Sequence, residues 1–522
     1  LMIRRPPRSP LFPYTTLFLA IGQTRQLTKI IFPHRRSGRC FLYRARRNAE
    51  AAHIIVVNHS LLLSDMLVSN RVLPEYHHLI IDEAHHLEGR ATDQLGFAVE
   101  RSQIRFLLAG LARRTSAGRY IGFLPSIPQH FDGSSLTVEM RKKVSAYLEK
   151  LQGLVGGAHQ AADNLFDGMG DFVTETLSES GGANSAYSRH IELTSGVRCQ
   201  PDWSEIEIRA DDLDSALLKI EQSLEGLHKG FAELDDQGIL HYDDLLQDIW
   251  ARLDRVRGTR VQLQTIICQP RPESESIYWL STGANDGEIA LHSAPLHVGQ
   301  SLKQSLFSKL DTVILTSATL RTADNFDHIR DRLGLEDADE LTVGSPFDYV
   351  HSTLLYVPTD VPEPGQRDYQ NTVVKAVMNL CLATGGRALV LFTSHWQLRT
   401  TYHAITKPLE KADIIVYGQG LDGSRRQLLE RFRATPRSVL LGTRSFWEGI
   451  DVVGPALSYL VIVRLPFSVP TDPIFAARSR HFDDPFGQYA VPEAVLRFRQ
   501  GFGRLIRSTT DRGVVVVLDK RI

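Results

Sequence analysis

The strongest constraint on the fold is an alternation of short apolar segments with longer amphipathic segments in the C-terminal part of the chain. The apolar segments are rich in β-branched residues, and the intervening sequence is long enough for a helix. Parallel strands need helical crossovers, so the alternation predicts parallel sheets and an α/β fold. The predicted strands are 312–315, 388–392, 414–417, 438–441, 459–463 and 514–518, and similar apolar runs predict strands at 54–57, 78–81, 277–280 and 289–292.

Residues 100–275 follow a different pattern. Apolar residues recur at helical spacing in two series, which are Val144, Tyr147, Leu148, Leu151 and Leu154, and Leu213, Leu217, Ile220, Leu224 and Leu227. This spacing predicts a mostly helical insertion. A Gly- and Ser-rich stretch at 178–188 is predicted to be a mobile loop, and the prolines of Pro346–Pro364 are predicted to join two sheets. Shorter helices are predicted at 41–53 and 61–68.

The composition is that of a globular protein with several domains. The chain has 522 residues, 43% hydrophobic and 23% charged, with a formal net charge of −1. A neutral total does not exclude nucleic acid, because binding needs a local basic surface rather than a basic average. No apolar run is long enough to cross a bilayer, so we expect no membrane span.

Four cysteines are present, and they are far apart in the sequence. Cys40, Cys199, Cys268 and Cys381 form no Cys-x-x-Cys pair, which argues against a disulfide framework and fits a reducing cytoplasm. We interpret the last three as small buried residues.

The first eighteen residues do not follow the pattern of a folded segment. Prolines interrupt any helical period, and no acidic residue precedes Glu50. One interpretation is a basic targeting peptide. The other, which we favour, is foreign sequence, because the string resembles translated sequencing-adapter read-through. Residues 1–18 are therefore left out of the fold prediction.

The clearest chemical motif is Asp82-Glu83-Ala84-His85, which follows directly after a predicted buried strand. Open α/β folds bind ligands at the carboxyl ends of their strands. In nucleotide motors the first acid there holds Mg²⁺ and the second orients the attacking water. The alternative is an exposed acidic turn without chemical function.

Two further motifs also follow predicted strands. Leu315–Leu320 contains small hydroxyl residues, which could form hydrogen bonds that connect a nucleotide site to a neighbouring domain. In Gly442–Asp451, hydroxyl and guanidinium groups could donate to phosphates, whereas Glu448 and Asp451 could hold Mg²⁺-bound water or ribose. The alternatives are an ordinary strand end for the first, and a Gly-containing loop with a buried Trp447 for the second.

The last motif is Gln500–Arg507, in which Arg504 and Arg507 are three residues apart. On a helix they would share one face. Two guanidinium groups directed at one site suit a γ-phosphate, because each can donate a bidentate pair of hydrogen bonds. The alternative is a solvated basic helix face.

In this order the motifs resemble those of superfamily 2 helicases. More specifically, the chain resembles the DinG branch of the XPD-like helicases in the segments Val57–Leu62, Phe446–Gly449 and Arg464–Phe467 with Pro470 and Asp472–Pro473. The resemblance covers about residues 38–522. It implies two RecA-like, P-loop NTPase-type motor domains with parallel sheets, and a mostly helical Arch-like insertion in the first. The implied parts are an iron–sulfur domain remnant at 19–53, the first motor domain at 54–99 and 276–345, the insertion at 100–275, and the second motor domain at 346–522.

The resemblance also implies roles for single residues. Asp82 would bind Mg²⁺, Glu83 would act as the catalytic acid/base, and His85 would couple ATP to DNA. The second motor domain would complete the ATP site with Gln500, Arg504 and Arg507, and Thr316, Ser317 and Thr319 would link hydrolysis to movement. Phosphate contacts to single-stranded DNA are expected from Ser394, His395, Thr443 and Arg444.

The sequence departs from the family pattern in two places. A phosphate-binding loop needs Gly-x-x-x-x-Gly-Lys-Ser/Thr, and the chain contains no Gly-Lys dipeptide. Cys40 matches the fourth ligand of the family's [4Fe–4S] cluster, but no cysteine precedes it. We interpret both departures as lost N-terminal coding sequence, and we expect the C-terminus to be shortened as well.

The expected parent protein is an ATP-dependent 5′–3′ DNA helicase of repair or replication. It would act as a monomer on single-stranded or forked DNA, in the cytoplasm and associated with the nucleoid, and the present chain would be inactive. The alternative is a degenerate motor that binds nucleic acid without hydrolysis, although the intact Asp82, Glu83, Arg504 and Arg507 argue against it. Some relatives carry an N-terminal exonuclease, which is a third hypothesis for the parent.

Overall fold

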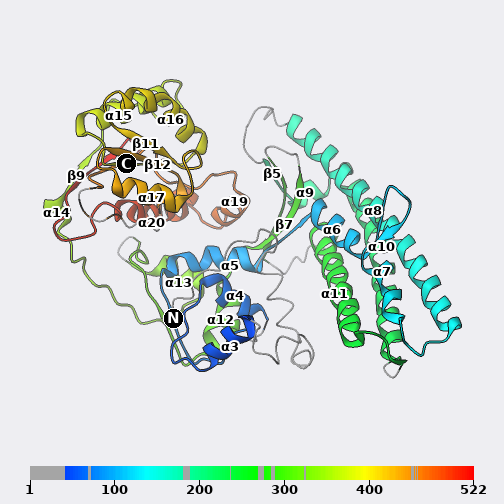
Figure 1. Cartoon of the computed structure of the whole chain (residues 1–522). Helices are drawn as coiled ribbons and strands as arrows, with labels where there is room; N and C mark the ends of the chain where they lie inside the picture. Colours follow the sequence, from blue (N-terminus) through cyan, green and yellow to red (C-terminus); the bar gives the residue numbers. More distant parts are fainter. Residues whose placement is uncertain are drawn as a thin grey trace. The chain divides into compact units, whose positions relative to one another are not determined.

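The structure is a computed structural model, and Figure 1 shows its elements. It describes residues 41–68, 72–179, 189–234, 237–268, 275–283, 288–322, 325–447, 452, 454 and 456–521. The chain forms two compact units. The first unit contains the residues up to Thr316 together with 331–335 and 471–477, and the second contains 317–330, 336–470 and 478–522.

A two-stranded parallel sheet carries the acidic motif in the first unit. Strand β1 (His78–Ile81) pairs with β8 (Thr312–Leu315), and Ile81 lies opposite Leu315. Helices α3 (Phe41–Glu50), α4 (His59–Leu67) and α5 (Leu87–Leu95) precede and follow β1. The predicted strands 78–81 and 312–315 and the predicted helices are confirmed, but the predicted burial of 78–81 is wrong, because Ile80 is 70% exposed and only Ile81 is buried.

The predicted buried strand at 54–57 is wrong. These residues form no strand, and the side chains of Ile54 and Val56 are 81% and 84% exposed. An apolar run becomes a strand only where a neighbour supplies hydrogen-bond partners and a cover for its side chains. Among the described residues nothing pairs with this run. Asn58 then caps α4 by accepting a hydrogen bond from the Leu61 amide, which starts the helix.

Three long helices form most of the remainder of the first unit. They are α8 (Val138–Glu179), α10 (Pro201–Ala232) and α11 (Tyr242–Ile267), joined by the shorter α6 (Arg101–Leu111). The predicted series in α10 is buried in one core with Trp203 and the apolar residues of α8 and α11. The helical character of this segment is therefore confirmed. Most of the predicted loop at 178–188 lies outside the described residues.

A four-stranded antiparallel sheet adjoins these helices. Its order is β2 (Phe97–Glu100), β7 (Ile289–Pro295), β6 (Ser276–Thr282) and β5 (Arg189–Glu192). Strands β6 and β7 confirm two predictions, whereas β2 and β5 were not predicted. Ile474 and Ala477 pack against Ile277 and Leu296 of this sheet, which explains why 471–477 belongs to the first unit.

The second unit is built on a six-stranded sheet in which every pair is parallel. Its order is β11 (Ile415–Gly418), β12 (Ser438–Gly442), β10 (Ala388–Leu391), β13 (Tyr459–Ile462), β14 (Gly513–Val517) and β9 (Thr353–Tyr356). The predictions for β10 to β14 are confirmed. Strand β9 was missed, because it lies in Pro346–Pro364, which was predicted only to join two sheets.

Helices cover both faces of this sheet (Figure 1). On one face, α15 (Tyr369–Thr384) and α16 (His395–Glu410) pack on alternate strand residues such as Val390 and Val461. On the other face, α17 (Arg425–Ala434), α18 (Arg444–Trp447) and the end of α20 (Val491–Phe502) adjoin a core that contains Leu389, Leu391 and Leu460. This three-layer arrangement explains why the strands are apolar on both sides.

No helix in the described residues is both long enough and apolar enough to cross a membrane.

Candidate functional site

The acidic turn follows directly after β1. The Ala84 amide donates to the Thr316 carbonyl at 3.1 Å, and the Thr316 amide donates to the Ile81 carbonyl at 2.9 Å, so the ladder with β8 continues into the turn. Glu83 has a left-handed backbone (φ 51°), and its amide donates to Asp82 Oδ1 at 2.9 Å. A left-handed non-glycine residue is uncommon and marks a functional candidate. Both carboxylates are exposed at the carboxyl end of the strand.

Three histidines surround this turn. His85 Nδ1 is 3.4 Å from Glu83 Oε2, and the His85 side chain is only 8% exposed. Its Nε2 is 2.9 Å from His86 Nε2. His59 donates from Nε2 to the Asp82 carbonyl at 2.9 Å, which connects α4 to the turn. His85 was predicted as a site residue, whereas His59 and His86 were given no role. His59 belongs to the segment that carried the family resemblance, so a signal for it was present.

A polar cluster lies at the carboxyl edge of the six-stranded sheet. The Thr443 amide and hydroxyl both donate to Gln419 Oε1, at 2.7 and 3.0 Å, and Thr443 Oγ1 is 3.4 Å from His395 Nε2. These residues follow β12, β11 and β10, so three adjacent strands supply the cluster. Ser394 precedes α16 at this edge. Gln419 was missed by sequence reasoning, and its position directly after β11 was the available signal.

The segment after Thr316 packs on α20 within the second unit. The Thr319 amide donates to Ser317 Oγ at 3.1 Å, and Gln500 Nε2 lies 3.4 Å from Thr319 Oγ1. Arg499 donates to the Arg321 carbonyl at 2.9 Å. Two of the predicted site residues, Thr319 and Gln500, are therefore in contact. The motif 315–320 contains the boundary between the two compact units, which falls after Thr316.

The helical spacing proposed for Arg504 and Arg507 is wrong. Helix α20 ends at Phe502, and Gly503 and Arg504 form a turn. A Cβ on Gly501 would lie 2.7 Å from Trp447 Cε3, so glycine permits the indole to pack on α20. Arg504 Nε then donates to the Trp447 carbonyl at 3.0 Å.

Arg507 lies in a second turn that is held by Asp511. Asp511 accepts from the amides of Arg507 and Ser508 at 2.9 and 2.8 Å. Burial opposes ionisation of Asp511, but these donors outweigh it and lower the pKa of the carboxyl.

Some predicted site residues lie outside the described residues, namely Cys40, Glu448, Asp451 and the side chain of Arg444. Of the described cysteines, Cys381 is buried as predicted and Cys268 is half-buried, with its thiol 3.7 Å from Asp211 Oδ1. Cys199 is exposed, so its prediction as a buried residue is wrong. The described residues, which include three of the four cysteines, hold no group of three or more His, Cys, Asp or Glu that could bind a metal ion.

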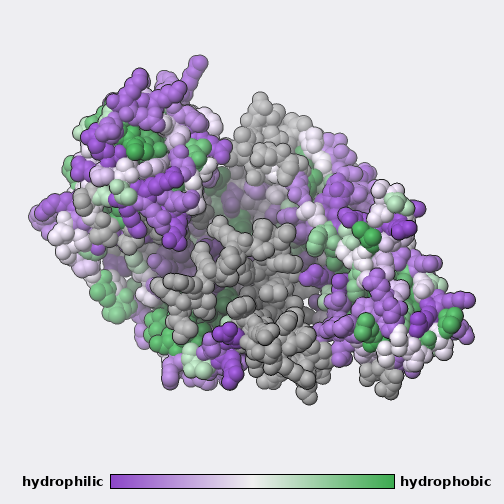
Figure 2. Space-filling model, in the orientation of Figure 1, coloured by the Kyte–Doolittle hydropathy of each residue, from purple (hydrophilic) through white to green (hydrophobic). Residues whose placement is uncertain are grey.

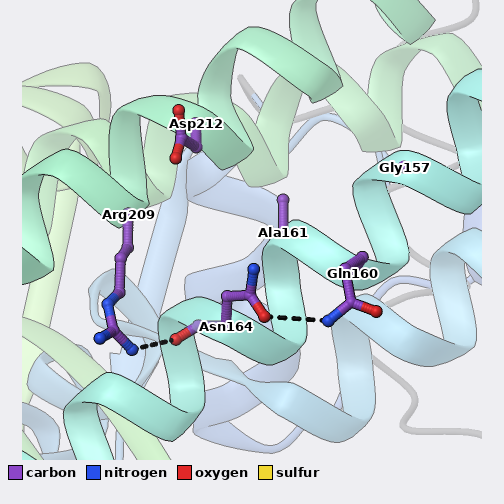
Figure 3. A pocket seen from close by; sticks show the side chains of 6 residues that line it. All are labelled: Gly157, Gln160, Ala161, Asn164, Arg209 and Asp212. Atoms are coloured by element: carbon purple, nitrogen blue, oxygen red, sulfur yellow. Dashed lines mark hydrogen bonds between the residues drawn. The ribbon is translucent and has the colours of Figure 1, made fainter.

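An open cavity of about 620 Å³ lies between α8 and α10, away from these motifs (Figure 3). Gln160 donates to Asn164 Oδ1 at 2.9 Å, and Arg209 donates to the Asn164 carbonyl at 3.0 Å. Gln160, Asn164 and Arg209 are thus engaged with one another, and the cavity contains none of the predicted site residues.

Comparisons with known proteins agree with these motifs. The family described as DEAD_2 matches residues 19–104, and the family described as helicase C-terminal domain matches residues 377–522. The ATP-dependent DNA helicase DinG of Photobacterium profundum is 30% identical over 514 residues, which cover 94% of this chain and 68% of that protein. The 3′-5′ exonuclease DinG of Bacillus subtilis is 29% identical over 92% of this chain and 51% of its own length. A solved XPD helicase aligns at 15% identity over 92% of this chain and 71% of that chain, with a TM-score of 0.49.

The two family matches and the relatives place the chain in the helicase class. Within that class, the chain belongs to the DinG family. It spans about half the length of the B. subtilis relative and 66% of the Escherichia coli helicase YoaA, to which it is 30% identical.

Proposed function

We propose that this chain is the greater part of an ATP-dependent DNA helicase, which couples ATP hydrolysis to 5′–3′ movement on single-stranded DNA. One observation carries the proposal: two exposed carboxylates follow β1 in a turn whose backbone is hydrogen-bonded to Thr316 at the end of β8. Names of relatives support it, because the P. profundum and E. coli proteins are named ATP-dependent DNA helicases. Forked DNA in repair or replication is the proposed setting.

In this proposal the acidic turn performs the hydrolytic chemistry. Asp82 would hold Mg²⁺, which neutralises charge on the phosphates when it is bound. Glu83 would orient the attacking water and accept its proton, because its carboxylate is exposed at the carboxyl end of the strand. His85 contacts Glu83 and is nearly buried, so it is suited to transmit a change at Glu83 to the protein behind it.

The second unit would contribute the remaining groups. Gln500, Arg504 and Arg507 are proposed to stabilise charge on the phosphates, with Glu448 and Asp451 as further nucleotide contacts. Thr316, Ser317 and Thr319 would transmit the state of the nucleotide. The Gln500–Thr319 contact supports this role, because it joins two of the proposed residues directly. We also propose that the helices between 100 and 275 form the Arch-like insertion, and that 54–99 with 276–345 and 346–522 are the motor domains.

Single-stranded DNA is proposed to bind at the polar edge formed by Ser394, His395, Thr443 and Arg444. Hydroxyl, imidazole and guanidinium groups donate to phosphate oxygens without reading sequence. Binding should therefore tolerate any base sequence and weaken with salt. The exposed position of His395 and its contact with Thr443 support this assignment. We further propose that the protein acts as a monomer in the cytoplasm, and that an iron–sulfur cluster, if the parent has one, uses Cys40.

The roles of the two acids can be tested in a chimera. The phosphate-loop region of a DinG relative would be placed before this chain, because the chain has no Gly-Lys of its own. Glu83→Gln should abolish DNA-stimulated ATP hydrolysis while ATP binding persists, since the amide keeps its shape but cannot accept the proton. Hydrolysis and nucleotide binding would be measured separately, with Asp93→Asn, at an exposed carboxylate of α5, as the matched control. Turnover at the unsubstituted rate in Glu83→Gln would remove Glu83 from this role.

A second candidate is a degenerate motor that binds nucleic acid without hydrolysis. The absence of a Gly-Lys dipeptide favours it. A chimera that binds ATP but never hydrolyses it, even with Glu83 present, would support this candidate.

A further inference from the structure

Helix α15 and all of helix α16 except its last residue, Glu410, contain no acidic residue. From Tyr369 to Leu409 the sequence contains neither Asp nor Glu, although it contains Lys375, Arg387, Arg399 and Lys407. At the overall frequency of 60 acids in 522 residues, a stretch of this length would hold about five. The two helices pack together on one face of the sheet (Figure 1), and Arg399 and Lys407 of α16 are exposed.

One face of α16 carries an aromatic ring and three basic side chains in a row. Trp396, Arg399, His403 and Lys407, here called the α16 stripe, are spaced by three and four residues and so lie on one side of the helix. All four are exposed, whereas the opposite side, which includes Leu398, Ile405 and Leu409, is buried against the sheet. In Figure 2 the surface over α15 and α16 is mainly hydrophilic.

Packing does not explain Trp396, which is the most exposed of the five tryptophans. The residue is 59% exposed, whereas Trp203 and Trp447 are buried. An indole that stays in solvent gives up the large burial that usually stabilises an aromatic residue. The positive charges of Arg399 and Lys407 are also not neutralised by a partner, because no acidic side chain in the described part of the chain forms an ion pair with either residue. By comparison, Arg426 on α17 pairs with Glu430 at 2.7 Å.

The α16 stripe is continuous with the polar edge of the sheet. His395, whose Nε2 is 3.4 Å from Thr443 Oγ1, is the first residue of α16 and precedes Trp396 directly. Along the helix axis, Trp396 and Lys407 are about 16 Å apart, which is room for a few nucleotides. A single-stranded nucleic acid bound across the polar edge would contact the indole of Trp396 next, and then the basic side chains of the α16 stripe.

We propose that the α16 stripe is a second contact surface for single-stranded nucleic acid, with Trp396 stacked on an unpaired base and Arg399 and Lys407 on phosphates. This inference rests on the proposed nucleic-acid binding and extends it beyond the polar edge. A flat indole beside unpaired cations fits this occupant, because every base offers a π face and every nucleotide a negative charge. An acidic protein segment would satisfy the cations but leave the indole without a stacking partner.

Binding of two labelled oligomers by the full chain tests the proposal. One is oligo(dT), and the other is an abasic deoxyribose-phosphate oligomer of the same length; both are followed by fluorescence anisotropy. Trp396→Ala should weaken oligo(dT) binding about 5- to 100-fold and leave abasic binding unchanged, because only bases stack. Trp396→Phe should restore part of the loss.

The charges are tested with the double variant Arg399→Gln/Lys407→Gln. It should weaken binding of both oligomers and reduce the slope of log Kd against log salt by about 1.4, since each phosphate contact contributes about 0.7 for single strands. Arg426→Gln is the matched control, because it removes one exposed cation from α17, and it should change neither affinity nor slope.

The outcomes separate the two proposals. If the unsubstituted chain binds no oligomer, the proposed nucleic-acid binding fails and this inference fails with it. If the chain binds but Trp396→Ala and the double variant behave like the parent, only the α16 stripe is wrong. An equal loss on both oligomers in Trp396→Ala contradicts stacking, as does binding of polyglutamate with the same dependence on Trp396.

Discussion

At the scale of single residues, the two acids of the turn after β1 could be located from sequence, whereas the contacts of the polar cluster at the edge of the six-stranded sheet could not. Asp82 and Glu83 end an apolar run, and the end of a parallel strand faces the ligand edge of its sheet. Gln419 also follows a strand, but its contact with Thr443 depends on the order of three strands in the sheet, which the sequence does not show. Trp447 was interpreted as buried under one alternative, and it is buried against Gly501.

Replacing Gly501 with Ala tests that contact. The new Cβ would lie 2.7 Å from Trp447 Cε3, so the ring or the helix must move. Overpacking costs about 1 to 3 kcal/mol of stability, and the higher helix propensity of alanine offsets up to about 1 kcal/mol of this loss. We expect the free energy of unfolding to fall by about 1 to 2 kcal/mol in urea titrations.

Gly344→Ala serves as the control in the same unit, because nothing lies within 4 Å of its Cβ position. Adding Trp447→Phe to Gly501→Ala should recover part of the loss, since the smaller ring leaves space for the methyl group. If Gly501→Ala is as stable as the parent, the close contact does not restrict this position.

At the scale of elements, burial on both faces decided which strands could be predicted. Strands β10 to β14 lie between two helical layers and are continuous apolar runs. Strands β2 and β5 are short and contain charged residues, and their partners are distant in the sequence. The run 54–57 has the composition of a strand but no partner in the described part of the chain. The end of α20 was missed because Gly503 stops the helix before the two arginines.

The antiparallel sheet also makes a prediction about pH. The His292 ring stacks on Trp279 with centroids 4.8 Å apart, and its Nε2 is 2.7 Å from Ser281 Oγ. Burial, with a smaller effect of His190, lowers the pKa of His292 to about 4. The unfolded chain therefore binds a proton near pH 6.5 that the folded chain does not bind until about pH 4. Stability should fall as the pH falls through this window, by at most about 3 kcal/mol.

Urea unfolding at pH 7, 6 and 5 would measure this loss. His292→Phe keeps an aromatic ring on Trp279 but cannot titrate, so its stability should decline less between pH 7 and pH 5. Ser281→Ala removes the hydrogen bond and keeps the imidazole, so its decline should match that of the parent. Equal slopes in the parent and His292→Phe would show that another group causes the acid sensitivity.

At the scale of the whole molecule, the order of motifs predicted the family and the two parallel sheets. The domain boundaries stay a prediction. Sequence could not show that 317–330 packs on α20, because that depends on the contacts of Thr319 and Arg321 with Gln500 and Arg499. It also could not place 471–477 on the antiparallel sheet, since a few apolar side chains make that contact.

The complete chain should bind DNA without hydrolysing ATP. A loop with Gly-Lys is needed to hold the β- and γ-phosphates, and the sequence has none. We expect no DNA-stimulated release of phosphate, together with oligonucleotide binding that weakens steeply as salt increases. The chimera described above is the positive control for hydrolysis. Appreciable turnover by the unmodified chain would show that other residues bind the phosphates.

Ile80 and Ile314, on the paired strands β1 and β8, are 70% and 49% exposed, and both strands are short and uncharged apart from His78. Among the described residues no third strand joins this sheet, so within this part of the chain both strands are edge strands with an exposed apolar side chain. Such edges promote self-association during synthesis and attract chaperones that recognise apolar strands. The chain is therefore expected to accumulate in inclusion bodies, and a charged side chain in place of Ile80 should increase its yield in the soluble fraction.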